Sequence, residues 1–315
     1  MGEVKGQASL SVIITSYNYG SFLAEAIDSV LGQSFLPDEL LLVDDGSTDK
    51  SRDIMLSYAE AYPGLIRVDI HADNMGIVET FSKAVSDTSG DYICFLGADN
   101  LFSPNYLEKC FDVLESDENI LIAYTDYALF GSRARVVYES HRAEWRGAIE
   151  NDKLYRIEFP EFNDRARDML KTSNFIHGSS MYRRSAYESC GGYREPSGGS
   201  PEDHDLFTRM LAANEPYGIA RKVHDAVLLY RQHSEAQANI KSQIASKAAA
   251  YDDVVAHWQR DVAELMHEVE LRDRRIVELT ETVESLSFEL EKLSNTTNSR
   301  TKKLGIRLPF LGNRN

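Results

Sequence analysis

The stretch Leu40–Asp49, which reads LLLVDDGSTD, constrains the fold more than any other part of the chain. Its four apolar residues, Leu40–Val43, are typical of a strand buried on both faces, and two carboxylates follow them directly. Gly46 predicts a turn, and the small polar residues after it can begin a helix. The pattern therefore places Asp44 and Asp45 at the carboxyl edge of a sheet, where open α/β folds bind ligands. The alternative is that both acids only stabilise the turn and the helix start.

The same alternation of strand, polar loop and helix occurs three more times in the first half of the chain. The further apolar runs are 10–14, 66–70 and 92–96, and each is followed by a polar loop and then by apolar residues at helical spacing. Four such units predict a mostly parallel sheet covered by helices. Because parallel strands end at one edge, we expect their loops to converge there. These loops are 15–18, 44–45, 73–74 and 99–100.

The composition and the motifs that are missing from the sequence argue against several classes of function. The 315 residues carry a formal net charge of -16, which argues against nucleic acid as the main partner because phosphate binding needs a basic surface. The loop after the first strand reads TSYNYG, and neither G-x-G-x-x-G nor G-x-x-x-x-G-K occurs in the chain. Any nucleotide bound here is therefore not held by a glycine-rich loop. No apolar run is long enough to span a membrane, which predicts a cytoplasmic protein.

The pattern is weaker beyond residue 127. We expect a strand near 136–138, a helix at 162–170 and a strand or loop at 175–182. A firmer helix begins at Glu202 and ends at Pro216. Helical spacing puts Asp203 on its apolar face and Glu202 on the opposite face. An inward acid in a first turn should be held ionised by the helix dipole, and it is either a cap or a working base.

Four motifs resemble the inverting glycosyltransferases of family 2, which have the GT-A fold. SVIITSYN resembles the family's first strand and base-contacting loop, and LLLVDDGSTD its nucleotide-binding signature. YICFLGADN resembles the metal-binding DxD element, and GGYREPSGGSPEDHDLFTRM the segment that carries the catalytic base. YRQH resembles a further motif whose histidine can join the metal. Together the motifs span about residues 10–233 in the family's order.

The resemblance implies roles for residues at the donor site. Thr15, Tyr17 and Asp45 would hold the base and ribose of a UDP- or dTDP-linked sugar, with Asp45 accepting a ring N–H. Asp44 lies in the same signature and is a further donor-binding candidate. A divalent cation, Mn²⁺ or Mg²⁺, would bridge the donor diphosphate. The metal would be bound by Asp99 and His233, with Asn100 as an accessory residue.

One position departs from the family pattern. The first acid of the DxD element is replaced by Gly97, which leaves Asp99 as the acid in that motif. The resemblance also implies that Asp203 is the base that deprotonates an acceptor hydroxyl, with Glu202 as an accessory residue. The segment 177–180 and Trp145 have the composition of a cleft wall, but their spacing is equally compatible with packing.

The C-terminal quarter has a different pattern. Apolar residues recur every seven positions with a second series three residues later, which is typical of a coiled coil; the two series are Val255, Val262, Val269, Ile276, Val283, Leu290 and Trp258, Leu265, Leu279, Leu286, Leu293. A helix folded back on the first domain is the alternative. The segment 300–315 is basic and partly apolar, so it is either a contact for an anionic membrane surface or a disordered tail.

These observations predict three regions: a catalytic domain at 1–240, a coiled coil at 241–295 that forms a dimer or a trimer, and a basic tail at 296–315. The expected activity is transfer of a sugar from a nucleotide donor to a hydroxyl of a glycan or a lipid-linked acceptor. A non-catalytic scaffold built on a degenerate transferase domain, and a nucleotidyltransferase, are the alternatives.

Overall fold

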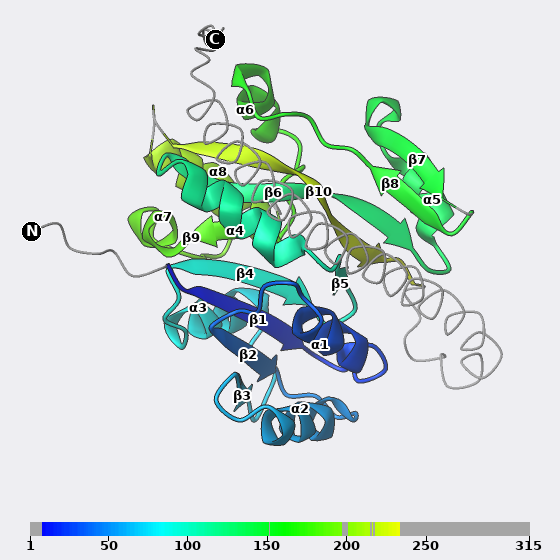
Figure 1. Ribbon diagram of the computed structural model, residues 1–315, viewed down its shortest axis with the longest axis vertical. Coiled ribbons are helices and arrows are strands. Elements are labelled where there is room, and N and C mark those ends of the chain that lie inside the picture. The colour runs from blue at the N-terminus through cyan, green and yellow to red at the C-terminus, as the bar shows by residue number, and fades with distance from the viewer. Residues whose placement is uncertain (1–7, 151, 197–200, 215, 217, 234–315) are drawn as a thin grey trace, which may run out of the picture. The chain divides into compact units, whose positions relative to one another are not determined.

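Four parallel strands build the first half of the sheet in the computed structural model, which describes residues 8–150, 152–196, 201–214, 216 and 218–233. The strands are β1 (Leu10–Ser16), β2 (Glu39–Asp44), β3 (Ile66–Ile70) and β4 (Tyr92–Gly97). β2 and β4 flank β1, and β3 lies outside β2 (Figure 1). Thr15 is aligned with Gly97, and Ser16 with Asp44, so the strands end level with one another. The predicted convergence of the loops at one edge is confirmed.

The helices that follow these strands in the chain bury one apolar face each. They are α1 (Leu23–Leu31), α2 (Ser51–Ala61), α3 (Ile77–Ser86) and α4 (Tyr106–Ser116). In α1 the buried residues recur every three or four positions, at Leu23, Ala26, Ile27 and Val30, as the sequence predicts. Burying a side chain of the size of leucine or isoleucine contributes roughly 1.5–3 kcal/mol, so these faces hold the helices on the sheet.

The second half of the sheet is mixed rather than parallel. Across the described strands the order is β3-β2-β1-β4-β9-β6-β10-β5, with β8 paired to β6 and β7 to β8. β9 runs antiparallel to both β4 and β6, whereas β10 runs parallel to β6. The predicted parallel order is therefore confirmed up to β4, and beyond it the antiparallel strands β5, β8 and β9 pair with the parallel strands β6 and β10. These strands are β5 (Leu101–Phe102), β6 (Ile120–Phe130), β7 (Arg146–Glu150), β8 (Leu154–Ile157), β9 (Met181–Arg183) and β10 (Ile219–Arg231).

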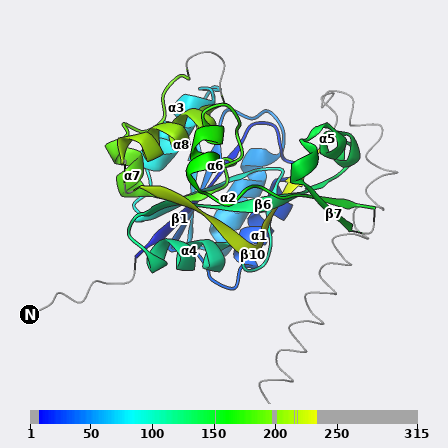
Figure 2. The same ribbon diagram turned by 90° about the horizontal axis from the view of Figure 1, so that it is seen from above.

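The remaining helices are short except for the last. They are α5 (Ala134–Ser140), the 3-10 helix η1 (Ala143–Trp145), α6 (Asp164–Leu170), α7 (Arg184–Ser189) and α8 (Glu202–Ala213). α4 and α8 cover opposite faces of the sheet around β6 (Figure 2). The helix predicted at 162–170 is confirmed as α6. Its N-cap is Asn163, whose side chain accepts a hydrogen bond of 3.0 Å from the backbone N–H of Ala166.

The strand predicted at 136–138 is wrong, because these residues lie in α5. Val136 is 61% exposed, whereas Val137 and Tyr138 pack against the core. The Tyr138 hydroxyl also donates a hydrogen bond of 2.8 Å to the carbonyl of Gly147. Tertiary contacts on one helical face thus outweigh the strand preference of the β-branched residues.

The turn after β2 requires the glycine at position 46. Gly46 has φ of +78°, and a Cβ there would lie 2.7 Å from the backbone N of Asn74. The loops that follow β2 and β3 therefore touch at a point where a side chain would clash. This contact brings Asp45 beside the loop that begins at His71.

Two predictions fall on residues outside the described part of the chain: the coiled coil at 241–295 and the basic tail at 296–315. Both remain predictions. Among the described helices, none is both long and apolar enough to cross a membrane.

Candidate active site

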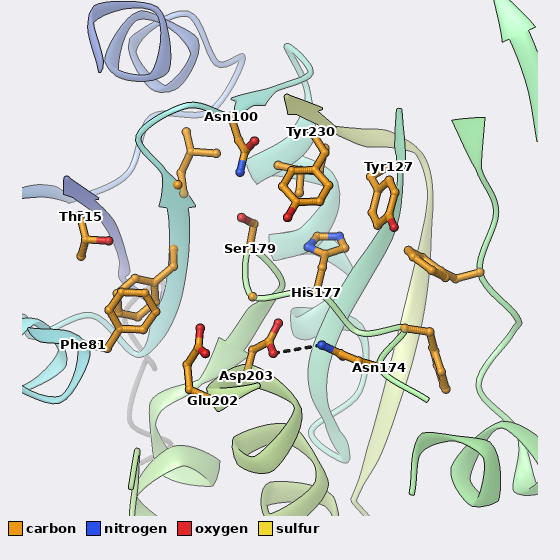
Figure 3. Close-up of a pocket in the computed structure, with 17 residues that line it drawn as sticks. Thr15, Phe81, Asn100, Tyr127, Asn174, His177, Ser179, Glu202, Asp203 and Tyr230 are labelled. Carbon is orange, nitrogen blue, oxygen red and sulfur yellow. Dashed lines mark hydrogen bonds between the residues drawn. The ribbon is translucent and has the colours of Figure 1, made fainter. Parts of the chain in front are cut away.

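A cavity of about 360 Å³ opens at the carboxyl ends of β1 and β4 (Figure 3). One side is formed by the parallel half of the sheet and the other by β6, β10, α8 and the segment before β9. Its lining is Thr15, Phe81, Phe95, Leu96, Gly97, Asn100, Tyr127, Phe159, Asn174, Phe175, His177, Gly178, Ser179, Glu202, Asp203, Leu228 and Tyr230. The cavity therefore combines residues far apart in sequence, with two acids on one wall and aromatic rings around them.

Asp203 and Glu202 both reach this cavity from the first turn of α8 (Figure 3). The expectation that Glu202 faces away from Asp203 is wrong, because the first turn of α8 is open to the cavity. The buried stripe of α8, Leu206, Phe207, Met210 and Leu211, lies further along the helix and is as predicted. The two adjacent carboxylates thus share one wall.

The Asp203 carboxylate is held at one oxygen. Its Oδ1 accepts hydrogen bonds from Asn174 Nδ2 at 3.0 Å and from the backbone N–H of His204 at 2.7 Å. Oδ2 makes no hydrogen bond within the described part of the chain, and it lies 3.4 Å from where a Cβ on Gly178 would stand. One oxygen is therefore fixed by donors while the other faces the cavity, as a proton acceptor requires.

The pKa of the Asp203 carboxyl is higher than the sequence-based expectation implies. Burial, reinforced by the charge of Glu202, raises the pKa of the Asp203 carboxyl to about 6. The helix dipole does not outweigh the loss of solvation in this position. Asp203 is thus a carboxylate that can accept a proton near neutral pH, which is the property expected of a general base.

His177 lies on the same side of the cavity, between Tyr127 and Tyr230 (Figure 3). Its Nε2 is 3.2 Å from the hydroxyl oxygen of Thr125, and its Nδ1 is buried without a partner among the described residues. Burial lowers the pKa of His177 to about 4, so the ring is neutral at physiological pH. A neutral imidazole here offers a hydrogen bond rather than a charge.

Asp99 and His233 come together just outside the lining of the cavity. His233 Nε2 lies 3.0 Å from Asp99 Oδ2, and the imidazole ring stacks on Phe22 at 5.4 Å. Arg231 donates from Nε to the carbonyl of Asp99 at 2.7 Å and from its backbone N to Asn100 Oδ1 at 3.0 Å. These hydrogen bonds hold the end of β10 against the loop after β4. They bring together Asp99 and His233, the two residues predicted as metal ligands.

Asp44 and Asp45 have unlike surroundings. Asp45 Oδ1 is 2.8 Å from His71 Nδ1 and accepts a hydrogen bond of 2.9 Å from the backbone N–H of Met75. Asp44 is fully buried, no hydrogen bond reaches either of its carboxylate oxygens within the described part of the chain, and Arg52 Nε lies 4.0 Å from its Oδ2. Asp45 Oδ1 is therefore committed to the loop after β3, whereas the oxygens of Asp44 are covered by the protein.

A family model described as glycosyl transferase family 2 matches residues 11–191, which is more than half of the chain. The chain belongs to this family. The match runs from β1 through α7, so it includes the donor side of the cavity and stops before α8, the helix that carries Asp203.

Individual relatives agree with this assignment of the family 2 domain. The putative glycosyltransferase EpsE of Bacillus subtilis is 32% identical over 206 residues, covering 64% of this chain and 66% of that protein. The minor teichoic acid biosynthesis protein GgaA of the same organism is 30% identical over 230 residues, covering 71% of this chain and 47% of that protein. The chain thus spans about half to two thirds of these relatives.

A solved structure agrees on the fold of the family 2 domain. The mannosyltransferase PcManGT from Pyrobaculum calidifontis, solved with GDP-Man and Mn²⁺, superposes with a TM-score of 0.54 at 18% identity. The superposition covers 74% of this chain and 59% of that protein. The domain therefore has a GT-A-like fold, and the prediction of a family 2 domain with this fold is confirmed.

The cavity of this family 2 domain is lined by some of the predicted site residues and not by others. Thr15, Asn100, Glu202 and Asp203 line the cavity, whereas Tyr17 is 46% exposed and lies outside its lining. Outside it too are Asp44, Asp45, Asp99 and His233. Trp145 is buried behind the wall, with its ring 5.5 Å from that of Phe159.

Sequence reasoning missed several residues of the cavity. Asn174, Tyr127 and Phe81 line it, but none belongs to a motif singled out in the sequence, and Tyr230 lies in the YRQH motif without a role being predicted for it. Asn174 precedes the segment 177–180, whose polar character was the available signal. Its role depends on the position of α8, which the sequence does not specify.

Proposed function

We propose that this chain is an inverting glycosyltransferase in which Asp203 is the general base. The proposal rests on the environment of the Asp203 carboxylate. Oδ1 is held by Asn174 and His204, Oδ2 faces the cavity, and burial raises the pKa to about 6. A base with these properties is ionised at neutral pH and close enough to it in pKa to take a proton.

The reaction requires one displacement at the anomeric carbon of the donor sugar. The acceptor hydroxyl oxygen attacks this carbon from the side opposite the nucleoside diphosphate, and its proton passes to Asp203 Oδ2. The new glycosidic C–O bond forms as the bond to the diphosphate breaks, so the configuration at the anomeric carbon is inverted. The protein supplies a base and no nucleophile.

The donor is proposed to be a UDP- or dTDP-linked sugar bound at the carboxyl ends of β1, β2 and β4. Thr15 lines the cavity at the end of β1, and Tyr17 is exposed in the loop after it. For the ring N–H of uracil or thymine the proposed acceptor is Asp45. Its Oδ1 is already bonded to His71 and Met75, so Oδ2 is the oxygen proposed to accept the N–H, whereas both oxygens of Asp44 are buried.

A divalent cation, Mn²⁺ or Mg²⁺, is proposed to be held by Asp99 and His233. The donor set is suitable, because a carboxylate and an imidazole lie 3.0 Å apart and His233 Nδ1 has no hydrogen-bond partner in the described chain. Within the described residues no third His, Cys, Asp or Glu joins them, so further ligands would come from the donor phosphates and water. When bound, such a cation stabilises the charge of the departing diphosphate.

The acceptor is proposed to be a hydroxyl of a glycan or of a lipid-linked saccharide. The rings of Tyr127, Tyr230, Phe159 and Phe175 border the cavity beside Asp203, and flat aromatic surfaces suit the C–H faces of sugar rings. Relatives named for teichoic acid biosynthesis and as glycosyltransferases support a place in bacterial surface polysaccharide assembly.

The experiment that tests this function is a thermal-shift panel of nucleotide sugars, each with Mn²⁺ and with a chelator. A ligand at about 100 times its dissociation constant adds roughly 2.7 kcal/mol to the free energy of unfolding, which gives a clear rise in melting temperature. We expect a UDP- or dTDP-sugar to give the largest shift, and to need Mn²⁺ for it. Failure of every nucleotide sugar and nucleoside diphosphate to shift the transition would contradict the proposal.

A further inference from the structure

The loop after β4 has a small gap where a side chain is missing. Residues 97–100 form a tight turn, closed by a hydrogen bond of 3.0 Å from the backbone N–H of Asn100 to the carbonyl of Gly97. A Cβ at Gly97 would stand 2.8 Å from Asn100 Nδ2 and 3.3 Å from Asp99 Oδ1. Gly97 and Asn100 both line the cavity. At 2.8 Å a Cβ would clash with Nδ2, so only glycine fits while Asn100 lies here; the space above Gly97 on the cavity side, called the gap below, has an amide nitrogen and a carboxylate oxygen beside it.

The orientation of the Asn100 amide is fixed by its neighbour on β10. The backbone N–H of Arg231 donates to Asn100 Oδ1 at 3.0 Å, and a backbone N–H can only donate. The oxygen of the amide must therefore face Arg231, and Nδ2 lies on the side of Gly97; in Figure 3 the nitrogen of Asn100 points into the cavity. Asn100 is only 7% exposed, and no hydrogen bond from its Nδ2 is found within the described chain.

The amide N–H₂ group of Asn100 lies at the cavity without an acceptor among the described residues, so a ligand there can accept a hydrogen bond from it. An amide nitrogen does not bind a cation, and Asn100 Oδ1 is occupied by Arg231, so Asn100 is not a further metal ligand. A ligand group that occupies the gap must accept a hydrogen bond from Asn100 Nδ2 and donate one to Asp99 Oδ1. A hydroxyl has this combination, whereas a phosphate oxygen accepts only.

We propose that the gap at Gly97 binds a hydroxyl of the transferred sugar, with Asn100 Nδ2 donating to it and Asp99 Oδ1 accepting from it. The proposal rests on the function proposed above, because it takes the ligand of the cavity to be a nucleotide sugar. It makes Asn100 a residue that recognises the sugar rather than the nucleotide. It also gives a role to the glycine that replaces the first acid of the family motif.

The test compares a nucleotide sugar with its nucleoside diphosphate. The ligands are the sugar that gives the largest shift in the panel above and the corresponding UDP or dTDP, measured by isothermal titration calorimetry on the full chain. Asn100→Asp keeps the oxygen that accepts from Arg231 and replaces the amide donor by a second acceptor. We expect the nucleotide sugar to bind about 5- to 20-fold more weakly relative to the nucleoside diphosphate, the loss of one hydrogen bond with its partner left unpaired.

A second variant, which adds no charge, separates the proposed effect from the effects of added charge and of misfolding. Gly97→Ala places a methyl group 2.8 Å from Asn100 Nδ2 and fills the gap, so it should reduce the same affinity ratio without changing charge. Asn163→Asp is the matched control. It also exchanges an amide for a carboxylate, keeps the bond accepted from Ala166, and lies outside the lining of the cavity, so the ratio should stay as in the wild type.

The outcomes separate this inference from the proposed function. An unchanged ratio in both variants, or an equal loss for the sugar and the diphosphate, overturns the assignment of Asn100 to the sugar. A gain of Mn²⁺ affinity in Asn100→Asp together with tighter nucleotide sugar binding would also overturn it, because position 100 would then act on the metal. If the wild type binds neither ligand, the proposed function itself fails.

A panel of deoxy sugars identifies the hydroxyl. The wild type should bind one deoxy nucleotide sugar as weakly as Asn100→Asp binds the complete sugar, and this variant should not distinguish the two. If every deoxy sugar loses affinity equally in the wild type and in the variant, no hydroxyl reaches Asn100 and the proposal is wrong.

Discussion

Asp45 in the parallel half of the sheet and Asp203 in α8 have opposite environments. Burial works against ionisation of Asp45, but hydrogen bonds from His71 and from the backbone of Met75 hold the pKa of that carboxyl below its usual value of 3.8. Burial of Asp203 is not offset in this way, and with the charge of Glu202 it raises the pKa to about 6. Both carboxylates are thus buried, but only Asp45 has enough hydrogen-bond donors to offset the burial.

This difference separates fixed binding groups from a group that exchanges a proton. A carboxylate with a low pKa stays ionised and accepts hydrogen bonds at any physiological pH, which suits the organisation of a loop or the binding of a ligand. A carboxylate with a pKa near 6 takes up and releases a proton close to neutrality.

Removal of the base should have the largest effect. Asp203→Asn keeps the size of the side chain and its position beside Asn174 but cannot accept a proton from the acceptor. Turnover should fall by about 10²- to 10⁴-fold, with little change in donor affinity, as measured by initial rates and calorimetry. Glu202→Gln is the control, since it shares the cavity wall and should have the smaller effect. Near-normal turnover in Asp203→Asn would remove this residue from the mechanism.

Removal of the metal ligands should affect donor binding rather than the proton transfer. Asp99→Ala should abolish the dependence of nucleotide-sugar binding on Mn²⁺, and His233→Ala should weaken binding about 10- to 100-fold. The matched control is His224→Ala, because His224 is 67% exposed and paired with Glu161. Binding in the wild type that is the same in Mn²⁺ and in chelator would contradict the proposed metal site.

The two environments should give opposite dependences of stability on pH. The folded-state pKa of Asp203 is raised from 3.8 to about 6, so its contribution to stability is present below pH 4 and is lost as the pH rises through 6. Asp203→Asn lacks this loss, and its free energy of unfolding at pH 8 should exceed that of the wild type by about 1–3 kcal/mol. Urea unfolding at pH 4 and pH 8 measures the difference.

Asp45 should give the opposite dependence of stability on pH in the same experiment. Its folded-state pKa is lowered, so its contribution is present above pH 3.8 and is lost as the pH falls through the folded-state value. Asp45→Asn should therefore be less stable than the wild type at pH 8, by about 1–3 kcal/mol, because His71 and Met75 lose a charged acceptor. The same sign of effect in both variants would show that the two carboxyls do not differ as described.

Truncation should affect assembly and leave the chemistry nearly unchanged. A chain that ends at Ile240 keeps every site residue named above, so its turnover should match that of the full chain within about twofold. Light scattering should show the full chain as a dimer or a trimer and the shortened chain as a monomer, because the predicted heptad seam would be lost. In the full chain, lysine at both Ile276 and Val283 should also separate the subunits. A monomeric full chain would contradict the coiled coil.

The sequence by itself determined the parallel half of the sheet and the places of its acids. The runs that form β1, β2 and β4 are apolar from end to end because those strands are buried on both faces, and a polar loop follows each one. Local pattern and strand direction were enough to put Asp44 and Asp99 at one edge. The start of α8 and the position of Asp203 in its first turn could also be predicted, since helical periodicity is a local property.

Only the tertiary structure decided what those acids can do. The antiparallel insertion of β9 between β4 and β6 brings Asn174 and His177 to Asp203, and no local pattern encodes a pairing between strands so distant in the chain. The direction of a pKa shift depends on the sum of burial and of donors from several elements. In the same way, the Asn100 amide is oriented by Arg231, 131 positions away. Residue types are local information, whereas solvation and hydrogen-bond direction arise only when the whole sheet is assembled.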